Sequence, residues 1–251
     1  MWRQTEPVSR RLAERLAAQP GDVVLDLACG MGDTGFLVAR SIAPDGRVLA
    51  TDFSPEMLDR ARRNAAEQGA ENVEFRLLDA EDMDLPDDSV DGVVCRFGYM
   101  LMGDPVRALR ETRRVLCDGG RVAFAVWAAP QENLWAALPA LELITRGHVP
   151  PPEPGDPGIF AMADPARIAD ALERAGFADH SVEQVAFDWR YEGPDEHWEL
   201  TLKLAGPLAD ALGELPEEER AQIRQSVSER IGAILAGRGS VPALVHVVTA
   251  S

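Results

Sequence analysis

The residues best suited to chemistry lie in a glycine-containing stretch near the start of the chain. From Val24 to Gly35 it reads VLDLACGMGDTG: an apolar strand, an acid at Asp26, then glycines. Because glycine has no Cβ, Gly30 and Gly32 allow the backbone to approach a ligand closely. The helix expected next presents free N–H groups beside the same ligand. This pattern is typical of the first strand–helix loop in a nucleotide-binding α/β domain.

A second acid supports a nucleotide ligand. Gly30-x-Gly32-x-x-Gly35 matches the dinucleotide fingerprint, and Asp52 follows 20 residues after Gly32 at the end of the next predicted strand. A carboxylate there can accept two hydrogen bonds from a ribose diol. A tight strand–helix turn without a ligand is the alternative interpretation.

Asp26 distinguishes between the candidate cofactors. Dinucleotide sites place a pyrophosphate over the helix N-terminus, and a carboxylate just before the glycines would repel it. Asp26 instead suits a ligand with positive charge, and S-adenosylmethionine carries an ammonium and a sulfonium. The alternatives are an Asp26 that only accepts backbone N–H groups, an NAD(P)-dependent oxidoreductase, and a cofactor-binding protein that does not methylate.

Four segments resemble the class I S-adenosylmethionine-dependent methyltransferases, within them the small-molecule branch similar to the ubiquinone/menaquinone-type enzymes. The segments are DLACGMG (26–32), TDFSPEML (51–58), LLDAEDMDLPDDSVDGVVCRFGYML (77–101) and ALRETRRVLCDGGRVAFAVW (108–127). The resemblance is close over about residues 8–128 and loose beyond. It implies transfer of a methyl group from S-adenosylmethionine to a small, partly apolar acceptor. We expect O- or C-methylation first and N-methylation second.

The predicted cofactor contacts combine the residue patterns with this resemblance. By resemblance Asp79 binds the adenine amino group, with Glu81 or Asp82 as alternatives in the same acidic segment. Phe53 and Met57 are expected to sandwich the adenine. Arg96 is expected to meet the methionine carboxylate or to lie against the adjacent loop. The full set is Asp26, Ala28, Gly30, Gly32, Asp52, Phe53, Met57, Asp79, Ala80, Glu81 and Arg96.

The acceptor is expected to contact aromatic and methionine side chains, which suit an apolar ring or chain. These residues are Phe97, Tyr99, Met100, Trp127 and Trp135. Plain core packing is the alternative for Met100 and Trp135. Methyl transfer depends mainly on alignment, so no side chain must be catalytic, and His148 and His197 are the candidates if a general base is needed. No metal site is predicted.

These residues need a scaffold that brings strand ends together. Strands predicted at 23–27, 48–51, 73–77, 90–95 and 121–127 alternate with helices, which favours a parallel α/β sheet with helices on both faces. Apolar spacing predicts a helix at 7–18, helices are also expected at 34–42 and 133–146, and Ser54, Asp104 and Asp164 are predicted helix caps. By resemblance the sheet is Rossmann-like and seven-stranded, ending in an antiparallel pair near 182–189 and 243–249.

We expect three regions in the chain. Residues 1–20 form a helix that caps the cofactor site, 21–130 the cofactor-binding core, and 131–251 cap segments plus the last two strands. The mainly helical stretch 195–236 is expected to cover the site, with a solvated appendage or a homodimer surface as the alternative.

Composition narrows the partners. The formal net charge of −17 disfavours nucleic acid and anionic membrane surfaces. The three cysteines are widely spaced without a CxxC pair, which argues against disulfides or a zinc site. The apolar runs are too short to span a bilayer and no signal-peptide core is present, so a cytoplasmic location is expected.

Overall fold

A single seven-stranded sheet carries the predicted site. The computed structural model describes residues 2–153, 155–204 and 206–251. The strands are β1 (Val23–Leu27), β2 (Arg47–Asp52), β3 (Val73–Leu77), β4 (Val90–Arg96), β5 (Leu116–Trp127), β6 (His180–Trp189) and β7 (Val241–Ala250). They lie in the order β3-β2-β1-β4-β5-β7-β6. β1 to β5 pair in parallel, and β7 pairs antiparallel to β5.

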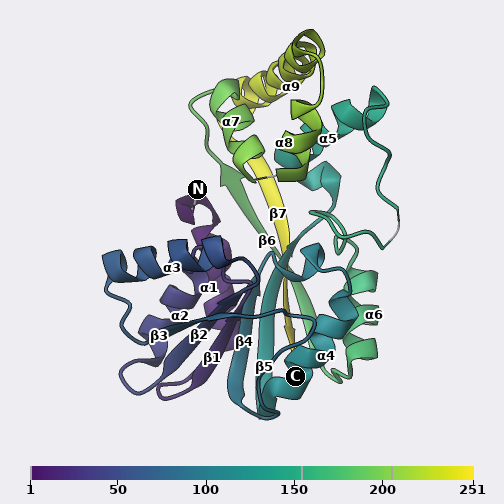
Figure 1. Cartoon of the computed structure of the whole chain (residues 1–251). Helices are drawn as coiled ribbons and strands as arrows, with labels where there is room; N and C mark the ends of the chain where they lie inside the picture. The colour runs from purple at the N-terminus through teal and green to yellow at the C-terminus, as the bar shows by residue number, and fades with distance from the viewer. Residues whose placement is uncertain (1, 154, 205) are drawn as a thin grey trace. The chain divides into compact units, whose positions relative to one another are not determined.

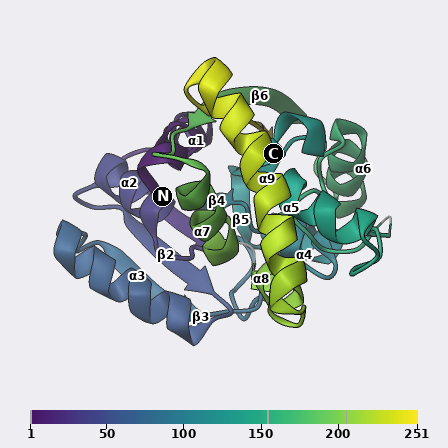
Figure 2. The same cartoon turned by 90° about the horizontal axis from the view of Figure 1, so that it is seen from above.

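Strand order determines which face each helix covers. The chain moves from β1 to β2 to β3 in one direction and from β4 to β5 in the other. Because parallel crossovers are right-handed, the helices in these two halves lie on opposite faces. Figures 1 and 2 show α1 (Trp2–Leu16), α2 (Asp33–Ile42) and α3 (Pro55–Gln68) on one face, and α4 (Pro105–Val115) and α6 (Pro165–Ala175) on the other. The predicted fold class is confirmed.

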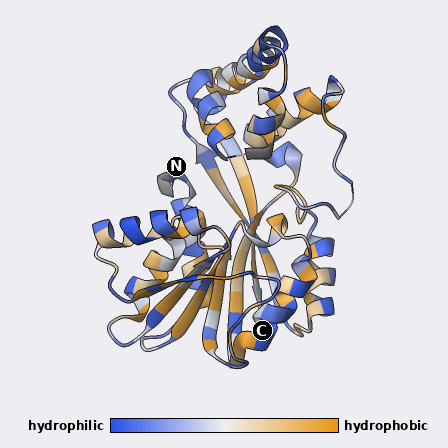
Figure 3. Ribbon diagram, in the orientation of Figure 1, coloured by the Kyte–Doolittle hydropathy of each residue, from blue (hydrophilic) through white to orange (hydrophobic). Residues whose placement is uncertain are grey.

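Apolar side chains fill the space between the sheet and its helices. Val24, Val93 and Phe124 on three central strands have no exposed surface. Figure 3 shows these strands as mostly hydrophobic, while the outer helix faces carry hydrophilic residues. Strands buried on both faces need near-continuous apolar runs, which explains why β1, β4 and β5 were recognisable in the sequence. Among the described residues, no helix is long and apolar enough to cross a membrane.

The described residues 78–89 connect β3 to β4 without a helix. Arg114 on α4 holds this connection: its guanidinium donates to the Met83 carbonyl at 2.8 Å and to the Leu85 carbonyl at 2.7 Å. Glu111, one turn earlier, accepts the Met83 backbone N–H at 2.9 Å and pairs with Arg114. Hydrogen bonds to the Glu111–Arg114 ion pair on α4 therefore hold this loop, which contains no helix of its own.

Several predicted boundaries differ from those observed. α1 runs from Trp2 to Leu16 rather than over 7–18, and it ends where Ala17 turns left-handed at φ 53°. β5 begins at Leu116 rather than 121 because its register with β4 jumps from Val90↔Leu116 to Gly92↔Arg121. The predicted Gly119-Gly120 turn is thus an irregularity within a strand. The three predicted caps are confirmed, since Ser54, Asp104 and Asp164 each accept a backbone N–H.

The chain divides into two compact units. The first comprises residues 1–127, 157–185 and 245–251, and the second comprises 128–156 and 186–244. The second unit holds η2 (Pro130–Glu132), α5 (Leu134–Thr145), α7 (Pro194–Leu204), α8 (Gly206–Gly213) and α9 (Glu217–Arg238). The predicted helical stretch 195–236 is therefore three helices, with Pro216 preceding α9.

Candidate cofactor site

The loop after β1 adopts the backbone that its glycines permit. Ala28, Gly30 and Gly32 all have positive φ, at 54°, 56° and 87°. The Gly32 position also excludes any side chain, because a Cβ there would lie 2.2 Å from the Phe36 ring. Asn64 on α3 donates to the Met31 carbonyl at 3.0 Å and holds the loop from the far side. The loop is thus a preformed turn at the carboxyl end of β1.

Asp52 ties this loop to the next strand. Its Oδ2 accepts the Gly30 N–H at 2.9 Å, and its Oδ1 accepts the Ser54 N–H at 3.0 Å. The side chain is 6% exposed. A carboxylate has about four lone-pair sites, so each oxygen retains capacity for one further donor. This geometry suits two adjacent hydroxyls.

Asp26 is buried beneath the loop. Its side chain is 1% exposed, and its Oδ2 accepts the Gly35 N–H at 2.9 Å. A Cβ at Gly35 would lie 2.4 Å from that oxygen, so glycine is needed for this contact. Burial raises the pKa of Asp26 to about 7, although the nearby Arg96 charge acts in the opposite direction. Burial therefore favours the neutral form of this carboxyl.

Arg96 connects β4 to α1 and α2. Its guanidinium donates to Ser9 Oγ at 2.7 Å and to Thr5 Oγ1 at 3.2 Å on α1, and to Asp33 Oδ2 at 3.2 Å. Asp33, the first residue of α2, is 5% exposed. Arg96 thus contacts α1 and the first residue of α2, and both of its predicted placements stay predictions.

The charges around the loop are unbalanced. Asp26, Asp33 and Asp52 are buried here, and Arg96 pairs with one of them. The N-terminus of α2, which attracts anions in dinucleotide sites, begins with the acid Asp33. A pyrophosphate would meet carboxylates on this side, whereas a cation would relieve the excess negative charge. The site is electrostatically suited to a positively charged ligand.

The predicted adenine contacts lie in the segments that follow β2 and β3. Phe53 is 79% exposed and Met57 38% exposed, both unusual for such side chains. Asp79 Oδ1 accepts the Glu81 N–H at 2.9 Å, leaving its Oδ2 available. Glu81 instead accepts the Asp104 N–H at 3.0 Å at the start of α4. Asp79 and Glu81 thus each use one carboxylate oxygen, and the choice among Asp79, Glu81 and Asp82 stays open. The adenine roles, including that of Ala80, stay predictions.

The predicted acceptor residues separate into different environments. Phe97 stacks on Trp127 in the first unit, with ring centroids 4.4 Å apart and planes inclined by 8°. Tyr99 is completely buried, contacts Phe124 edge-on, and its hydroxyl pairs with Thr112. Met100 is 3% exposed. The structure thus gives Tyr99 and Met100 packing positions, and Phe97 is the part-exposed member of the set in this unit.

The remaining predicted residues lie in the second unit. Trp135 is 2% exposed and contacts Trp189, with centroids 5.1 Å apart. His197 is completely buried and its Nε2 lies 2.8 Å from the Trp135 carbonyl. Burial lowers the pKa of His197. His148 Nε2 lies 2.9 Å from Glu219 on α9. A general-base role for either histidine stays untested.

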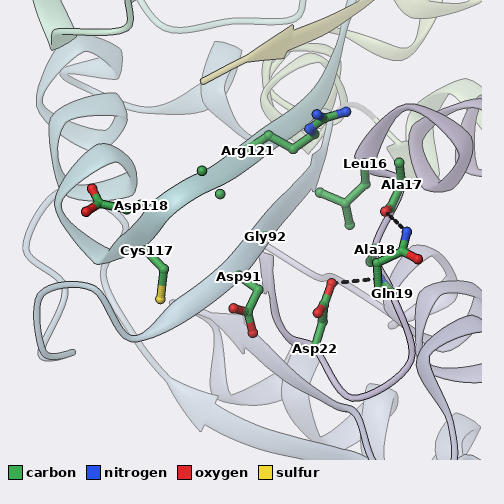
Figure 4. A pocket seen from close by; sticks show the side chains of 12 residues that line it. Leu16, Ala17, Ala18, Gln19, Asp22, Asp91, Gly92, Cys117, Asp118 and Arg121 are labelled. Atoms are coloured by element: carbon green, nitrogen blue, oxygen red, sulfur yellow. Dashed lines mark hydrogen bonds between the residues drawn. The ribbon is translucent and has the colours of Figure 1, made fainter.

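A cavity of about 420 Å³ lies at the other end of the sheet. Figure 4 shows it between the residues after α1 and the starts of β4 and β5, with Asp22, Asp91 and Arg121 on its walls. Asp22 and Asp91 are already engaged, since they accept the backbone N–H groups of Gln19 and Val23. The cavity contains none of the predicted cofactor residues. Ligands of parallel α/β sheets bind at the carboxyl ends of the strands.

Sequence reasoning missed several residues of the site. Thr5, Ser9, Asp33 and Asn64 contribute contacts that no motif indicated. Asp33 could have been recognised from the sequence, because an acid at the first position of a helix after a glycine loop argues against a bound phosphate. The others required knowledge of which helix packs over which strand end.

Comparisons with known proteins identify the family of this chain. A family model described as a methyltransferase domain matches residues 18–142. The demethylmenaquinone methyltransferase of Deinococcus radiodurans is 32% identical over 176 residues, covering 66% of this chain and 71% of that protein. The arsenite methyltransferase of Halobacterium salinarum is 43% identical over 109 residues, but these cover 43% of this chain and only 28% of that protein.

A solved structure supports the fold. The crystal structure of a SAM-dependent methyltransferase from Aquifex aeolicus superimposes with a TM-score of 0.52 at 20% identity, over 72% of this chain and 82% of that one. The chain belongs to the S-adenosylmethionine-dependent methyltransferases. Within them it is similar to the menaquinone-type enzymes, as the sequence motifs predicted.

Proposed function

We propose that this protein transfers a methyl group from S-adenosylmethionine to a small, partly apolar acceptor, by O- or C-methylation in preference to N-methylation. The observation that carries this proposal is the excess of buried carboxylate around the glycine loop, from Asp26, Asp33 and Asp52. A cationic sulfonium nucleoside relieves that excess, whereas a pyrophosphate adds to it. The same observation argues against the NAD(P)-dependent alternative.

The residues present fit such a cofactor. Asp52 has one unused lone-pair site on each carboxylate oxygen for the two ribose hydroxyls. Phe53 offers an exposed ring and Asp79 a free oxygen to the adenine. Asp26 and the loop with positive φ at Ala28, Gly30 and Gly32 serve the methionine end, where a positive charge also favours the ionised form of Asp26.

Methyl transfer places its main demand on alignment. S-adenosylmethionine supplies an activated methyl group on its sulfonium when bound. The chain contributes a rigid loop after β1, held by hydrogen bonds to Asp52 and Asn64. It thereby contributes positional order, the largest effect available to a bimolecular displacement. His148 and His197 remain the proposed bases for an acceptor that must lose a proton.

Because one relative is an arsenite methyltransferase, the cysteines of this chain are candidate ligands for arsenite. Trivalent arsenic is a soft centre that prefers thiolate ligands. Burial raises the pKa of the Cys29 thiol far above its usual range and that of Cys95 to about 12, so neither is a ready thiolate. Cys117 lies in the cavity at the opposite end of the strands. An organic acceptor is therefore the better proposal.

Titration calorimetry tests the cofactor, and a methylation screen tests the reaction. We expect S-adenosylhomocysteine to bind and NAD⁺ and NADP⁺ not to bind. Transfer of a labelled methyl group to a member of a phenol, quinol and amine library is then expected. Binding of a dinucleotide without S-adenosylhomocysteine binding would overturn the proposal. Cofactor binding without transfer to any acceptor would favour the non-methylating alternative.

A further inference from the structure

Phe97 has a backbone conformation that its side chain disfavours. It follows the last residue of β4 with φ 67°, in the left-handed region that glycine adopts freely and bulky residues rarely do. Among the described residues, three other non-glycine positions have positive φ, and one is Ala28 in the glycine loop after β1. Such strain persists where surrounding contacts impose it, and it concentrates at functional sites.

Contacts on both sides of Phe97 impose this conformation. Its N–H donates to the Ala125 carbonyl at 2.9 Å and extends the pairing of β4 with β5. Gly98 packs so closely that a Cβ would lie 2.6 Å from Cys95 Sγ and 2.9 Å from the Ala28 Cβ. The backbone that carries the Phe97 ring is therefore pressed against the proposed cofactor loop. The ring has a defined position relative to that loop.

The ring of Phe97 forms the outer layer of an aromatic stack. Its plane is inclined by 8° to that of Trp127, at a centroid distance of 4.4 Å. Trp127 is 5% exposed, whereas Phe97 is of intermediate exposure. The solvent-accessible surface of this pair therefore belongs mainly to Phe97. A partly exposed ring on a rigid aromatic base, at a strained position, is a poor packing solution and a suitable recognition surface.

We propose that Phe97 is the stacking surface for a planar aromatic acceptor. This inference rests on the proposed function and narrows its acceptor to molecules with a planar aromatic ring. A flat ring gains a parallel stacking contact on Phe97 in addition to apolar burial, whereas a saturated ring of the same size gains burial alone. Phe97 would thus select for aromaticity rather than for hydrophobicity.

Two probes matched in carbon skeleton and hydroxyl group separate these contributions. They are 2-naphthol, which is planar and aromatic, and decahydro-2-naphthol, which is saturated. Binding of each is measured by calorimetry to the full chain saturated with S-adenosylhomocysteine. Because an aromatic pair contributes about 0.5–1.5 kcal/mol beyond burial, we expect 2-naphthol to bind about 2- to 13-fold more tightly.

Two variants assign this preference to the ring. Phe97→Leu keeps an apolar side chain over Trp127 but has no aromatic face, so it should retain S-adenosylhomocysteine affinity while losing the preference for 2-naphthol. Phe97→Tyr is the control that keeps the ring and should keep the preference. Equal binding of the two probes to the wild type, no binding of either, or an unchanged preference in Phe97→Leu would overturn the inference. Failure of the wild type to bind S-adenosylhomocysteine would instead refute the proposed function.

Discussion

At the scale of single residues, Asp26 determines the electrostatics of the site. It is buried, it accepts one backbone N–H from Gly35, and Arg96 nearby is already paired with Asp33. Desolvation therefore dominates, and the pKa of the carboxyl rises to about 7. Burial of the Asp26 carboxylate therefore lowers the stability of the free protein, and the carboxylate attracts a cationic ligand. Strongly shifted pKa values of this kind are typical of groups in functional sites.

The first prediction concerns the pH dependence of stability. Between the unfolded pKa of 3.8 and the folded pKa of about 7, the folded chain holds a proton on Asp26 that the unfolded chain has released. Stability therefore falls as pH rises through this window, by about 4 kcal/mol at 1.36 kcal/mol per pKa unit. Asp26→Asn removes this contribution.

Urea unfolding of the cofactor-free protein at pH 5 and pH 8 measures this effect. We expect the variant to lack most of the wild-type loss and to be the more stable protein at pH 8. Asp79→Asn, at an exposed carboxylate, should follow the wild type. Identical pH profiles for wild type and Asp26→Asn would show that Asp26 does not titrate in this range.

The second prediction concerns Asp52. Asp52→Ala removes the acceptor of two backbone N–H groups and the proposed ribose contacts. We expect S-adenosylhomocysteine binding to weaken by about 1–3 kcal/mol, the cost of losing hydrogen bonds to a charged acceptor. Calorimetry measures the change. Asp59→Ala on the exposed side of α3 is the matched control and should bind normally, and an unchanged dissociation constant for Asp52→Ala would contradict the ribose role.

At the scale of elements, the connection from β3 to β4 shows how a loop can be held without a helix. This connection contains Asp79, a residue of the proposed adenine site. The carbonyls of Met83 and Leu85 in the same connection accept hydrogen bonds from Arg114 on α4. The Arg114 guanidinium also lowers the pKa of Glu111, so the pair stays ionised at neutral pH. One helix end therefore supports a loop of the cofactor site.

The third prediction follows from this support. Arg114→Ala removes the guanidinium that donates to two loop carbonyls and pairs with Glu111, which should destabilise the protein by about 1–3 kcal/mol. Hydrogen exchange should increase in residues 79–88, and S-adenosylhomocysteine affinity should fall. Arg107→Ala, on the same helix but exposed and 3.9 Å from Asp82, is the control and should change stability by less than about 0.5 kcal/mol. Equal effects of the two variants would refute the role of Arg114.

At the scale of the whole molecule, each of the two units buries a titratable side chain whose neutral form is favoured by desolvation. The proposed cofactor site lies in the first unit, where the pKa of Asp26 is raised. The second unit buries His197, whose pKa is lowered by desolvation. The carbonyl of Trp135 accepts from Nε2, and Nδ1 has no hydrogen-bond partner among the described residues. A neutral imidazole is therefore built into the second unit.

The fourth prediction concerns the buried imidazole of His197. Below the unfolded pKa of 6.5, the unfolded chain binds a proton at His197 that the folded chain does not, so stability falls as pH decreases. Hydrogen exchange of α5 and α7, corrected for intrinsic rates, should therefore be faster at pH 5.5 than at pH 7.5. His197→Gln should reduce this difference, while β1 and β2 should be unaffected by the substitution. Equal protection of α5 and α7 at both pH values would contradict the prediction.

The features that could be predicted from the sequence are those encoded within a few neighbouring residues. The glycine loop after β1, the three helix caps and the apolar central strands were all predictable, because backbone freedom, capping and periodicity are local properties. The acid at the end of β2 was predictable for the same reason. Together they identified the fold class and the family.

The contact partners of side chains such as Arg96, and the pKa of Asp26, depend instead on tertiary packing. Arg96 pairs with Asp33 and with α1, residues 63 to 91 positions away, and Phe97 stacks on Trp127 from the neighbouring strand. The pKa of Asp26 is raised because burial, which no local sequence pattern indicates, opposes the charge of its carboxylate. These outcomes depend on which strand ends become neighbours and how much water they exclude. That information exists only once the sheet and its helices have packed together.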